Sequence, residues 1–565
     1  MRILIAVLLI ATTASANDVT WRSMQSGSTT TPIHDRGIHG EGQIVAVLDT
    51  GVDWTSCYFA EADGSRPPLN TGTPSGGLQW QNINPLRRKI IAYNFLYSCD
   101  QFPSAVGCDN PALPQDYSSI TNAYDNQGHG THAAATAVGD KGTPIVHDLG
   151  DSLAPAAKLI VQDGGAVFDS AGRLLGDACS HRPGFGCPVN LYPILDQAYK
   201  QGARIHSNSW GDRQGTPLGL PSPTANYSQS ARDVDAFVFE HPDMLVVFNT
   251  GNFGRSDGSL EEGQMAPPSS LSAPGAAKNT IQAGGVRGWE GQSDNQVANY
   301  SLSGPTRDGR IKPDVVGPAF VLAGDARVYS KQECSASFAN GTSWASPTIA
   351  GAAALVRQYY TDGFYLGQRM TPSAALLKAT IIAAARPVPY RSTRFSRFDA
   401  EPVPSYEQGF GFPVLDDALS FPGETRKLRV YDVARDRGLA QGETFTATLD
   451  VRAGTPFKAV LVWTDPAGRA VGVADTSTQL VNDLDLRVVS PSVTMVGNQR
   501  LTGGQPDRVN NVEGVTIDAP SAGKVTVTIT APRIAVGPRQ GYALVLTGDF
   551  DAEAQSSQRR RAVRR

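Results

Sequence analysis

Residues 340–347 read Asn340-Gly341-Thr342-Ser343-Trp344-Ala345-Ser346-Pro347, and an apolar run from Thr348 to Val356 follows them. A turn of small residues therefore delivers Ser343 to the start of a predicted buried helix, with Pro347 expected in its first turn, where a missing backbone donor is harmless. A hydroxyl at a helix N-terminus lies in a positive field, near free backbone N–H groups. An acyl-transfer enzyme would place its nucleophile there, because its intermediate carries an oxyanion. Taken alone, the same residues also suit an ordinary helix N-cap.

Two upstream segments supply the partners that such a nucleophile needs. The apolar run from Ile44 to Leu48 predicts a buried parallel strand, and Asp49 follows at its carboxyl end, where open α/β sheets place their ligands. Further along, His129 opens an Ala-rich predicted helix. Asp49 also suits a turn and a lone histidine is often structural. Together with Ser343, however, they give an acid, a base and a nucleophile in the chain order Asp, His, Ser, which is the order of subtilisin.

Five short blocks together resemble the subtilisin-like serine proteases, the subtilase family (peptidase family S8). The blocks are Val47-Leu48-Asp49-Thr50-Gly51, Gly128-His129-Gly130-Thr131-His132, Asn208-Ser209-Trp210-Gly211, Thr250-Gly251-Asn252 and Asn340-Gly341-Thr342-Ser343. They occur in the family's order over roughly 300 residues, which makes the resemblance specific. It implies an α/β fold with a subtilisin-like, three-layer catalytic domain around a parallel sheet.

The resemblance also implies the catalytic roles. Ser343 matches the nucleophile and His129 the general base, while Asp49 matches the residue that holds the imidazole tautomer. Asn252 matches the side-chain oxyanion donor, which works beside the Ser343 backbone N–H; a plain turn is its other interpretation. His132 matches a structural position.

Substrate binding is implied by two of the blocks. Ser209, Trp210 and Gly211 match the strand edge that pairs with the substrate backbone and lines its first specificity pocket, and Gly251 lies in the neighbouring matched block. Polypeptide substrates would then bind by strand addition. The chain departs from the family after the nucleophile, where Trp344 stands in place of the usual methionine.

Composition agrees with an exported enzyme. The 565 residues are 40% hydrophobic and 18% charged, and the net charge of −4 argues against a nucleic-acid partner. Met1-Arg2, an apolar run from Ile3 to Ala11 and the triplet Ala14-Ser15-Ala16 predict a secretory signal peptide. No other segment approaches membrane length. We therefore expect a secreted monomer without a transmembrane segment and without a catalytic cofactor.

The cysteines fit an oxidising compartment. Six cysteines in an exported chain suggest disulfides, and six allow 15 pairings. Nearness in sequence favours Cys99 with Cys108 and Cys179 with Cys187, which leaves Cys57 for Cys334. Free buried thiols are the alternative.

The chain changes character near residue 390. Apolar strands alternate with helical stretches before that point, whereas short Val- and Thr-rich strands separated by turns follow it and predict an antiparallel β-sandwich. We therefore expect a signal peptide (1–16), a short N-terminal segment (17–40), a peptidase domain (41–390), a linker (391–424), a β-sandwich domain (425–549) and a disordered basic tail (550–565).

The second domain sharpens the resemblance. The stretches 461–466, 480–486 and 507–513 are similar to blocks of the oxidatively stable alkaline proteases of the KP-43 type, which carry a C-terminal jelly-roll domain. In that branch the small domain binds calcium. The resemblance implies structural calcium here, with hard oxygen ligands offered by Asp483, Asp485, Asn510, Asn511 and Glu513. The same residues also suit ordinary turns and loop caps.

The sequence thus predicts a secreted serine endopeptidase that works through an acyl-enzyme. One alternative is a binding protein on an inactive subtilase scaffold, which the complete set of catalytic blocks disfavours. An α/β-hydrolase esterase fits less well, because the Ser343 block lacks the Gly-x-Ser-x-Gly elbow and the chain order differs.

Overall fold

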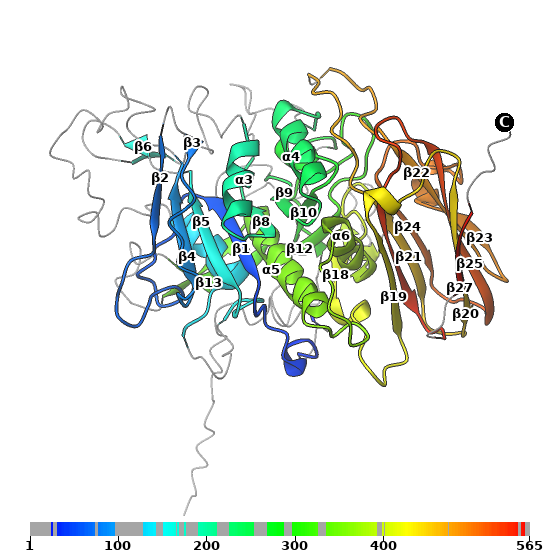
Figure 1. Cartoon of the computed structure of the whole chain (residues 1–565), viewed down its shortest axis with the longest axis horizontal. Coiled ribbons are helices and arrows are strands. Elements are labelled where there is room, and N and C mark those ends of the chain that lie inside the picture. Colours follow the sequence, from blue (N-terminus) through cyan, green and yellow to red (C-terminus); the bar gives the residue numbers. More distant parts are fainter. Residues whose placement is uncertain are drawn as a thin grey trace, which may run out of the picture.

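The computed structural model describes residues 24–25, 31–73, 77–96, 128–142, 151–164, 167–168, 174–176, 190–211, 225–252, 268–287, 296–325, 335–391, 398–400, 402–472, 474–551 and 555–559. Figure 1 shows a unit built on a parallel sheet beside a second unit built from antiparallel strands.

The N-terminal unit is organised around one ten-stranded sheet. Its strands are β1 (Ile44–Asp49), β2 (Leu69–Thr73), β3 (Gly77–Leu78), β4 (Ile90–Phe95), β5 (Lys158–Asp163), β8 (Ile205–Asn208), β9 (Leu245–Asn249), β10 (Ile281–Arg287), β11 (Gln296–Val297) and β12 (Val315–Pro318). Their order is β11-β10-β9-β8-β1-β5-β4-β2-β3, with β12 beside β10. β1 lies inside the sheet, parallel to both β5 and β8, so its carboxyl end opens at the edge where parallel sheets present their ligands.

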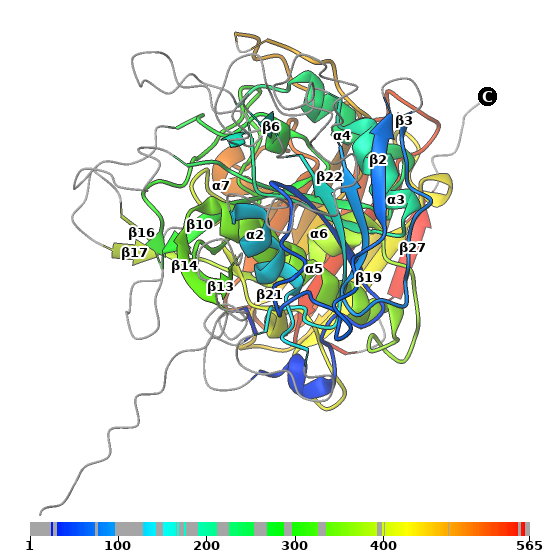
Figure 2. The same cartoon turned by 90° about the vertical axis from the view of Figure 1, so that its left-hand side faces the viewer.

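Two helices that carry catalytic blocks pack together on this sheet. α2 (His129–Val138) contacts β1, and α5 (Thr342–Thr361) contacts β8, β9, β10 and β12 (Figure 2). Their close approach needs small residues, because a Cβ on Gly351 of α5 would lie 2.9 Å from the backbone oxygen of Ala137 on α2. α3 (Tyr192–Lys200) and α4 (Gln229–Glu240) form a second helix pair, which contacts β3 and β9. The predicted α/β fold with a parallel sheet is confirmed.

Short two-stranded sheets also belong to this unit. They are β6 (Val167–Phe168) with β7 (Leu174–Gly176), β13 (Phe320–Gly324) with β14 (Ala336–Asn340), β15 (Ala385–Arg386) with β18 (Phe412–Pro413), and β16 (Pro389–Arg391) with β17 (Phe398–Ala400). The pair of β13 and β14 leads directly into the Ser343 turn.

The C-terminal unit consists of two antiparallel sheets, as predicted. One has the order β19-β26-β21-β24 and the other β23-β22-β25-β20-β27. The strands are β19 (Lys427–Val433), β20 (Thr444–Val451), β21 (Phe457–Val462), β22 (Asp483–Val489), β23 (Thr494–Val496), β24 (Val512–Ile517), β25 (Gly523–Arg533), β26 (Tyr542–Gly548) and β27 (Gln555–Arg559), and one short helix, α7 (Gln499–Thr502), lies between β23 and β24. Alternating apolar residues fill the space between the sheets.

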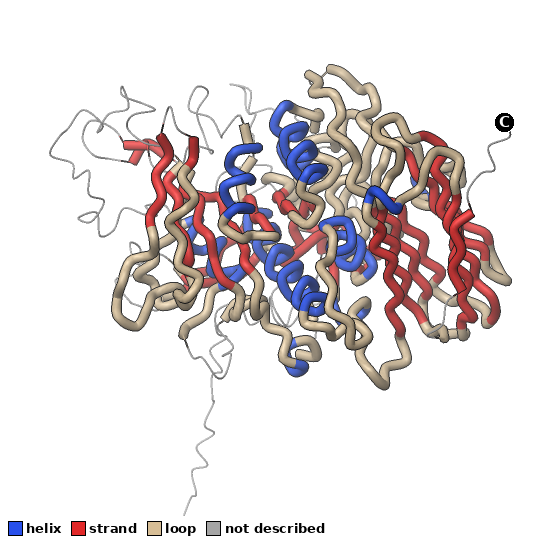
Figure 3. Tube along the Cα trace, viewed as in Figure 1, coloured by secondary structure: helices blue, strands red, loops and turns tan. Residues whose placement is uncertain are grey.

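The first of these sheets is buried on both faces. On β21, Ala459 and Leu461 belong to the sandwich core, whereas Val460 and Val462 belong to the core of the N-terminal unit. Successive strand residues point to opposite faces, so this strand serves two cores at once. Its outer face packs on α6 (Ala374–Ala383), and Figure 3 shows helices between the strands of the two units. The two units therefore share one continuous interior.

Polar groups also cross this junction, and two of them, Asp465 and Pro466, belong to the stretch 461–466 that resembles the KP-43-type proteases. The Lys278 ammonium is fully buried and forms an ion pair with Asp465 while donating to the backbone oxygens of Pro466 (2.6 Å) and Gln479 (2.8 Å). Asn279 Oδ1 accepts from the Asp465 backbone N–H at 2.9 Å. Burial raises the pKa of Asp465, against the nearby Lys278 charge. This ion pair is thus a structural link between the units.

Removing the ammonium should cost stability. We expect Lys278→Met to lower the free energy of unfolding by about 3–5 kcal/mol, because Asp465 is then a buried charge without its counter-ion. A thermal melt checks this. The control is Lys524→Met, which removes an exposed pair with Asp450 (3.0 Å) and should change stability by about 0–1 kcal/mol. Equal small shifts for both variants would contradict the structural role of Lys278.

Two expected segments, the linker and the tail, differ from the structure. The expected linker is packed rather than free, because the Phe410 N–H donates to Asp314 O and the Val316 N–H to Gly411 O. The expected disordered tail contains β27, which pairs with β20, so that expectation is wrong for residues 555–559. In both cases the structure depends on backbone hydrogen bonds between segments that are distant in sequence, and local composition does not indicate such bonds.

The cysteine predictions are mostly untested. Cys57 is disulfide-bonded. The other five cysteines lie outside the described residues, so the three pairings stay predictions. The predicted signal peptide also lies outside the described residues, and no helix in the described part of the chain combines the length and apolar character needed to cross a membrane.

Candidate active site

Asp49 and His129 meet at the carboxyl end of β1. His129 Nδ1 lies 2.7 Å from Asp49 Oδ1, and the Asp49 side chain is 3% exposed against 30% for the imidazole. The same carboxylate oxygen accepts from the Thr50 backbone N–H at 2.8 Å. Asp49 is thus held as an acceptor, which fixes the proton of His129 on Nδ1 and leaves Nε2 as the basic nitrogen.

The glycine after His129 explains why α2 can begin so close to β1. A Cβ on Gly130 would lie 2.1 Å from the backbone oxygen of Gly51 and 3.1 Å from Asp49 Cβ. The Gly130 backbone N–H instead donates to Thr50 Oγ1 at 2.9 Å. The His-Gly-Thr sequence is therefore a packing requirement of this junction.

Ser343 is the second residue of α5 and is 8% exposed. Its hydroxyl donates to the backbone oxygen of Ser209 at 3.3 Å. Its neighbour Trp344 packs on the imidazole of His129, with ring centroids 4.9 Å apart. The start of α5 therefore lies beside the Asp49–His129 pair.

Pro347 has a different place from the one expected. α5 begins at Thr342, so Pro347 lies inside the helix and cannot donate to the Ser343 carbonyl one turn earlier. The Ser209 hydroxyl donates to that carbonyl at 2.7 Å instead. The expectation that the missing donor is harmless in a first turn is wrong. Because Pro347 has no N–H, the Ser343 carbonyl is available to the Ser209 hydroxyl, and this bond ties the predicted substrate strand to Ser343.

The side chain of Asn252 is oriented by Thr342, the residue before Ser343. Its Oδ1 accepts from the Thr342 backbone N–H at 2.8 Å and from the Thr342 hydroxyl at 3.0 Å. Since both partners donate, the amide oxygen faces Thr342 and the NH2 group is left for another acceptor. A Cβ on Gly341 would lie 3.4 Å from Asn252 Nδ2, so the absence of a side chain at Gly341 leaves space beside the amide.

The residues predicted to bind substrate lie near Ser343, because the Ser209 hydroxyl and backbone oxygen both bind it. Trp210 is 9% exposed and packs edge-on against Phe248, with centroids 5.5 Å apart. A Cβ on Gly211 would lie 2.5 Å from Ser272 Cβ, and Gly251 has a φ of +93° that favours glycine. Gly211 and Gly251 thus both pack closely against Ser272.

His132 does not take part in the Asp49–His129 hydrogen bond. Burial lowers its pKa to about 4, and its Nε2 lies 3.0 Å from the Ser337 backbone oxygen. The ring is therefore neutral near pH 7 and adds no charge beside His129, which agrees with the structural role that the resemblance implied.

Four of the five predicted calcium ligands are divided between two tasks, and the fifth, Glu513, accepts from the Leu486 backbone N–H at 2.7 Å. Asn510 Oδ1 accepts from the Ile311 backbone N–H at 2.8 Å, and Asn511 Nδ2 donates to the Trp463 backbone oxygen at 2.8 Å. These amides join structural segments. Asp483 and Asp485 both bind the Arg508 guanidinium, at 2.9 and 2.5 Å. Among the described residues, no group of three or more His, Cys, Asp or Glu side chains is arranged to hold a metal.

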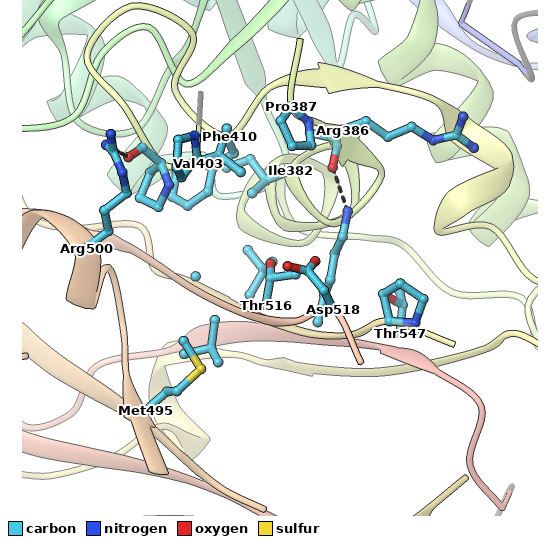
Figure 4. Close-up of a pocket in the computed structure, with 18 of the residues that line it drawn as sticks. Ile382, Arg386, Pro387, Val403, Phe410, Met495, Arg500, Thr516, Asp518 and Thr547 are labelled. Atoms are coloured by element: carbon cyan, nitrogen blue, oxygen red, sulfur yellow. Dashed lines mark hydrogen bonds between the residues drawn. The ribbon is translucent and has the colours of Figure 1, made fainter. Parts of the chain in front are cut away.

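A cavity of about 750 Å3 lies between α6, the segment 402–410 and the sandwich, away from the triad blocks (Figure 4). Lys458 lines it and donates to the backbone oxygens of Ala383 (3.0 Å) and Ala385 (2.5 Å), where α6 ends. Burial lowers the pKa of Lys458 to about 8. Arg386 and Arg426 pair with Asp417. Lys458, Arg386 and Arg426 therefore belong to the junction between the two units, and none of them belongs to the predicted catalytic site.

The site agrees with the comparisons to known proteins. The sequence profile described as the subtilase family, Peptidase_S8, matches residues 40–411, and the chain belongs to this family. It is 23% identical to the "Serine protease/ABC transporter B family protein tagD" of Dictyostelium discoideum, over 92% of this chain and 32% of that protein. It is 24% identical to Bacillopeptidase F of Bacillus subtilis (strain 168), over 57% of this chain and 18% of that protein.

The chain spans about a third of the length of the first curated relatives it matches. Among solved structures, the serine protease of Aeromonas sobria aligns with 95% of this chain and 94% of its own, at 13% identity and a TM-score of 0.39. The family membership rests on the sequence match, and the KP-43-type branch stays a prediction.

Proposed function

We propose that this chain is a secreted serine endopeptidase that hydrolyses peptide bonds through an Asp49–His129–Ser343 triad and an acyl-enzyme. The observation that carries the proposal is the 2.7 Å contact between Asp49 Oδ1 and His129 Nδ1 beside the helix start that bears Ser343. Because Nδ1 is held by Asp49, His129 Nε2 is the nitrogen that acts as the base. The predicted signal peptide supports export.

The reaction follows from these atoms. The Ser343 hydroxyl leaves its weak acceptor, the Ser209 carbonyl, and gives its proton to His129 Nε2 as its oxygen attacks the substrate carbonyl carbon. Asp49 stabilises the imidazolium that forms. The oxyanion accepts from the Ser343 backbone N–H and from Asn252 Nδ2. His129 then returns the proton to the leaving amine, and a water molecule repeats the sequence to release the acid.

Substrate binding uses the backbone beside Ser209. An extended peptide adds to the edge formed by Ser209, Trp210 and Gly211, with Gly251 nearby. The small space beside Gly211 supports a backbone contact there, since a Cβ would meet Ser272.

Hydrolysis of casein by the purified chain, with and without a fluorophosphonate, tests the proposal. We expect digestion that the fluorophosphonate abolishes, with cuts inside the casein chain rather than at its ends. A protein that neither digests casein nor reacts with the reagent would contradict the proposal and favour a binding protein on this scaffold.

We also propose that calcium binds at the buried carboxylates of Asp483 and Glu513, with backbone oxygens or water as its remaining ligands, since the described residues offer no set of three acidic, His or Cys side chains for a metal. Asp483 Oδ1 and Glu513 Oε1 are buried and have no hydrogen-bond partner among the described residues. Burial and Asp485 raise the pKa of Asp483 to about 6 against Arg508, while burial and Asp507 raise that of Glu513 well above its usual value. Buried carboxylates held this way are stabilised by a hard cation. Asn510 and Asn511 are left out of this set, because their amides serve the domain junction.

A chelator should therefore lower the melting temperature, and Asp483→Asn should abolish that effect. The raised pKa of Asp483 also sets the direction in which stability changes with pH. In chelator, native Asp483 holds its proton more tightly than the unfolded chain between its usual pKa of 3.8 and about 6, so its contribution to stability falls as pH rises through that window. The natural protein should lose more stability there than Asp483→Asn does. Identical melting curves with and without chelator would contradict calcium binding and would leave the charges of Arg508 and Arg533 to stabilise ionised Asp483.

A further inference from the structure

Trp344 occupies a place that the catalytic assignment does not use. Its indole lies between two histidines of α2, with its centroid 4.9 Å from that of His129 at a tilt of 39° and 4.2 Å from that of His132. It is 6% exposed and packs with Ala133 and Val321. The ring is therefore a rigid wall against the proposed general base.

This arrangement carries a cost that a simple core residue would avoid. Trp344 Nε1 is buried and has no hydrogen-bond partner among the described residues, although a buried indole N–H usually finds one. Leucine or phenylalanine would fill similar space without an unpaired donor. The energetic cost of the unpaired indole N–H indicates a use for the indole face, which attracts a cation more strongly than a phenylalanine ring does.

We propose that Trp344 is a positioning residue that holds the His129 imidazole in its catalytic orientation and stabilises the imidazolium formed during catalysis. The proposal rests on the proposed peptidase function. A cation within about 6 Å of an aromatic centroid is attracted to the ring face, and tryptophan is the strongest of the aromatic residues in this respect. During catalysis the imidazolium forms when His129 takes the Ser343 proton, so the contact is stronger in the transition state than before it.

The described neighbours of His129 leave room for this effect. The titratable groups that face it are Asp49 on β1, which binds Nδ1, and His132 on the same helix. Since burial keeps His132 neutral above about pH 4, it does not oppose a positive charge on His129. Trp344 therefore covers a ring face while Asp49 holds the ring edge.

Two variants at this position test the proposal in the full chain. Trp344→Leu removes the ring, and Trp344→Phe keeps a smaller aromatic face. We expect Leu to lower kcat about three- to tenfold, with KM within about twofold, and to move the acid limb of kcat/KM to lower pH by roughly half a unit. Phe should give a smaller change in the same direction.

An NMR titration reads the same effect without catalysis. On the Ser343→Ala background, with ring-labelled histidine and the His129 signal assigned by its loss in His129→Ala, the His129 midpoint should fall in the order Trp, Phe, Leu. An unchanged midpoint in either folded variant would overturn the proposal, as would a change in KM alone. If Leu fails to fold, the Phe midpoint decides. A natural protein that the fluorophosphonate does not label would instead contradict the proposed peptidase function. The NMR titration does not depend on that function, so the two failures can be told apart.

Discussion

Ser343→Ala should fold like the natural protein and lose peptidase activity by about 10⁵- to 10⁶-fold in kcat, because the triad members act as one unit. The side chain makes one weak hydrogen bond, at 3.3 Å to the Ser209 backbone, so the fold loses little. Initial rates on a peptide substrate, with a thermal melt of each protein, check both halves.

The matched control is Ser346→Ala. Ser346 lies about one turn further along α5, is fully buried and has its hydroxyl 3.4 Å from that of Ser207. It is not part of the proposed machinery, so most activity should remain. If Ser343→Ala kept more than about one per cent of the activity, another group would be the nucleophile.

Asn252→Ala is the second large effect. We expect kcat to fall by about 10²- to 10³-fold with KM nearly unchanged, since the amide donates most strongly to the charge of the transition state. Steady-state kinetics on a peptide substrate separate the two constants. A change mainly in KM would make Asn252 a substrate-binding residue instead.

Asn252 also anchors Thr342, and Asn252→Asp separates the two roles. Aspartate keeps an oxygen for the Thr342 N–H but has no donor for the oxyanion and adds a like charge. Its loss in kcat should equal or exceed that of alanine. An aspartate variant with near-natural kcat would show that anchoring Thr342 was the contribution that mattered.

Much of this site could be predicted from the sequence, because short backbone motifs fix it. Asp49 at a strand end and His129 at a helix start are local patterns, and their meeting follows from a parallel sheet. The strands around Thr444–Val451 and Tyr542–Gly548 were equally visible, since apolar periodicity reports burial.

The remainder depends on contacts between distant segments. The bond from Ser209 to the Ser343 carbonyl, which Pro347 makes available, links residues 134 apart in sequence. Asn510 and Asn511 have the oxygen chemistry of calcium ligands, yet the structure uses them at the domain junction, which no local pattern encodes. The presence of Trp344 was visible, but its place between two imidazoles was not.

The central claim is that Ser343 is a nucleophile activated by His129 and Asp49. The most direct test treats the natural protein with a fluorophosphonate, digests it and maps the adduct by mass spectrometry. The account predicts one phosphonylated peptide, modified at Ser343, and no such adduct after His129→Ala at the same exposure. An adduct on another residue, or labelling of Ser343 at an unchanged rate in the His129 variant, would contradict it.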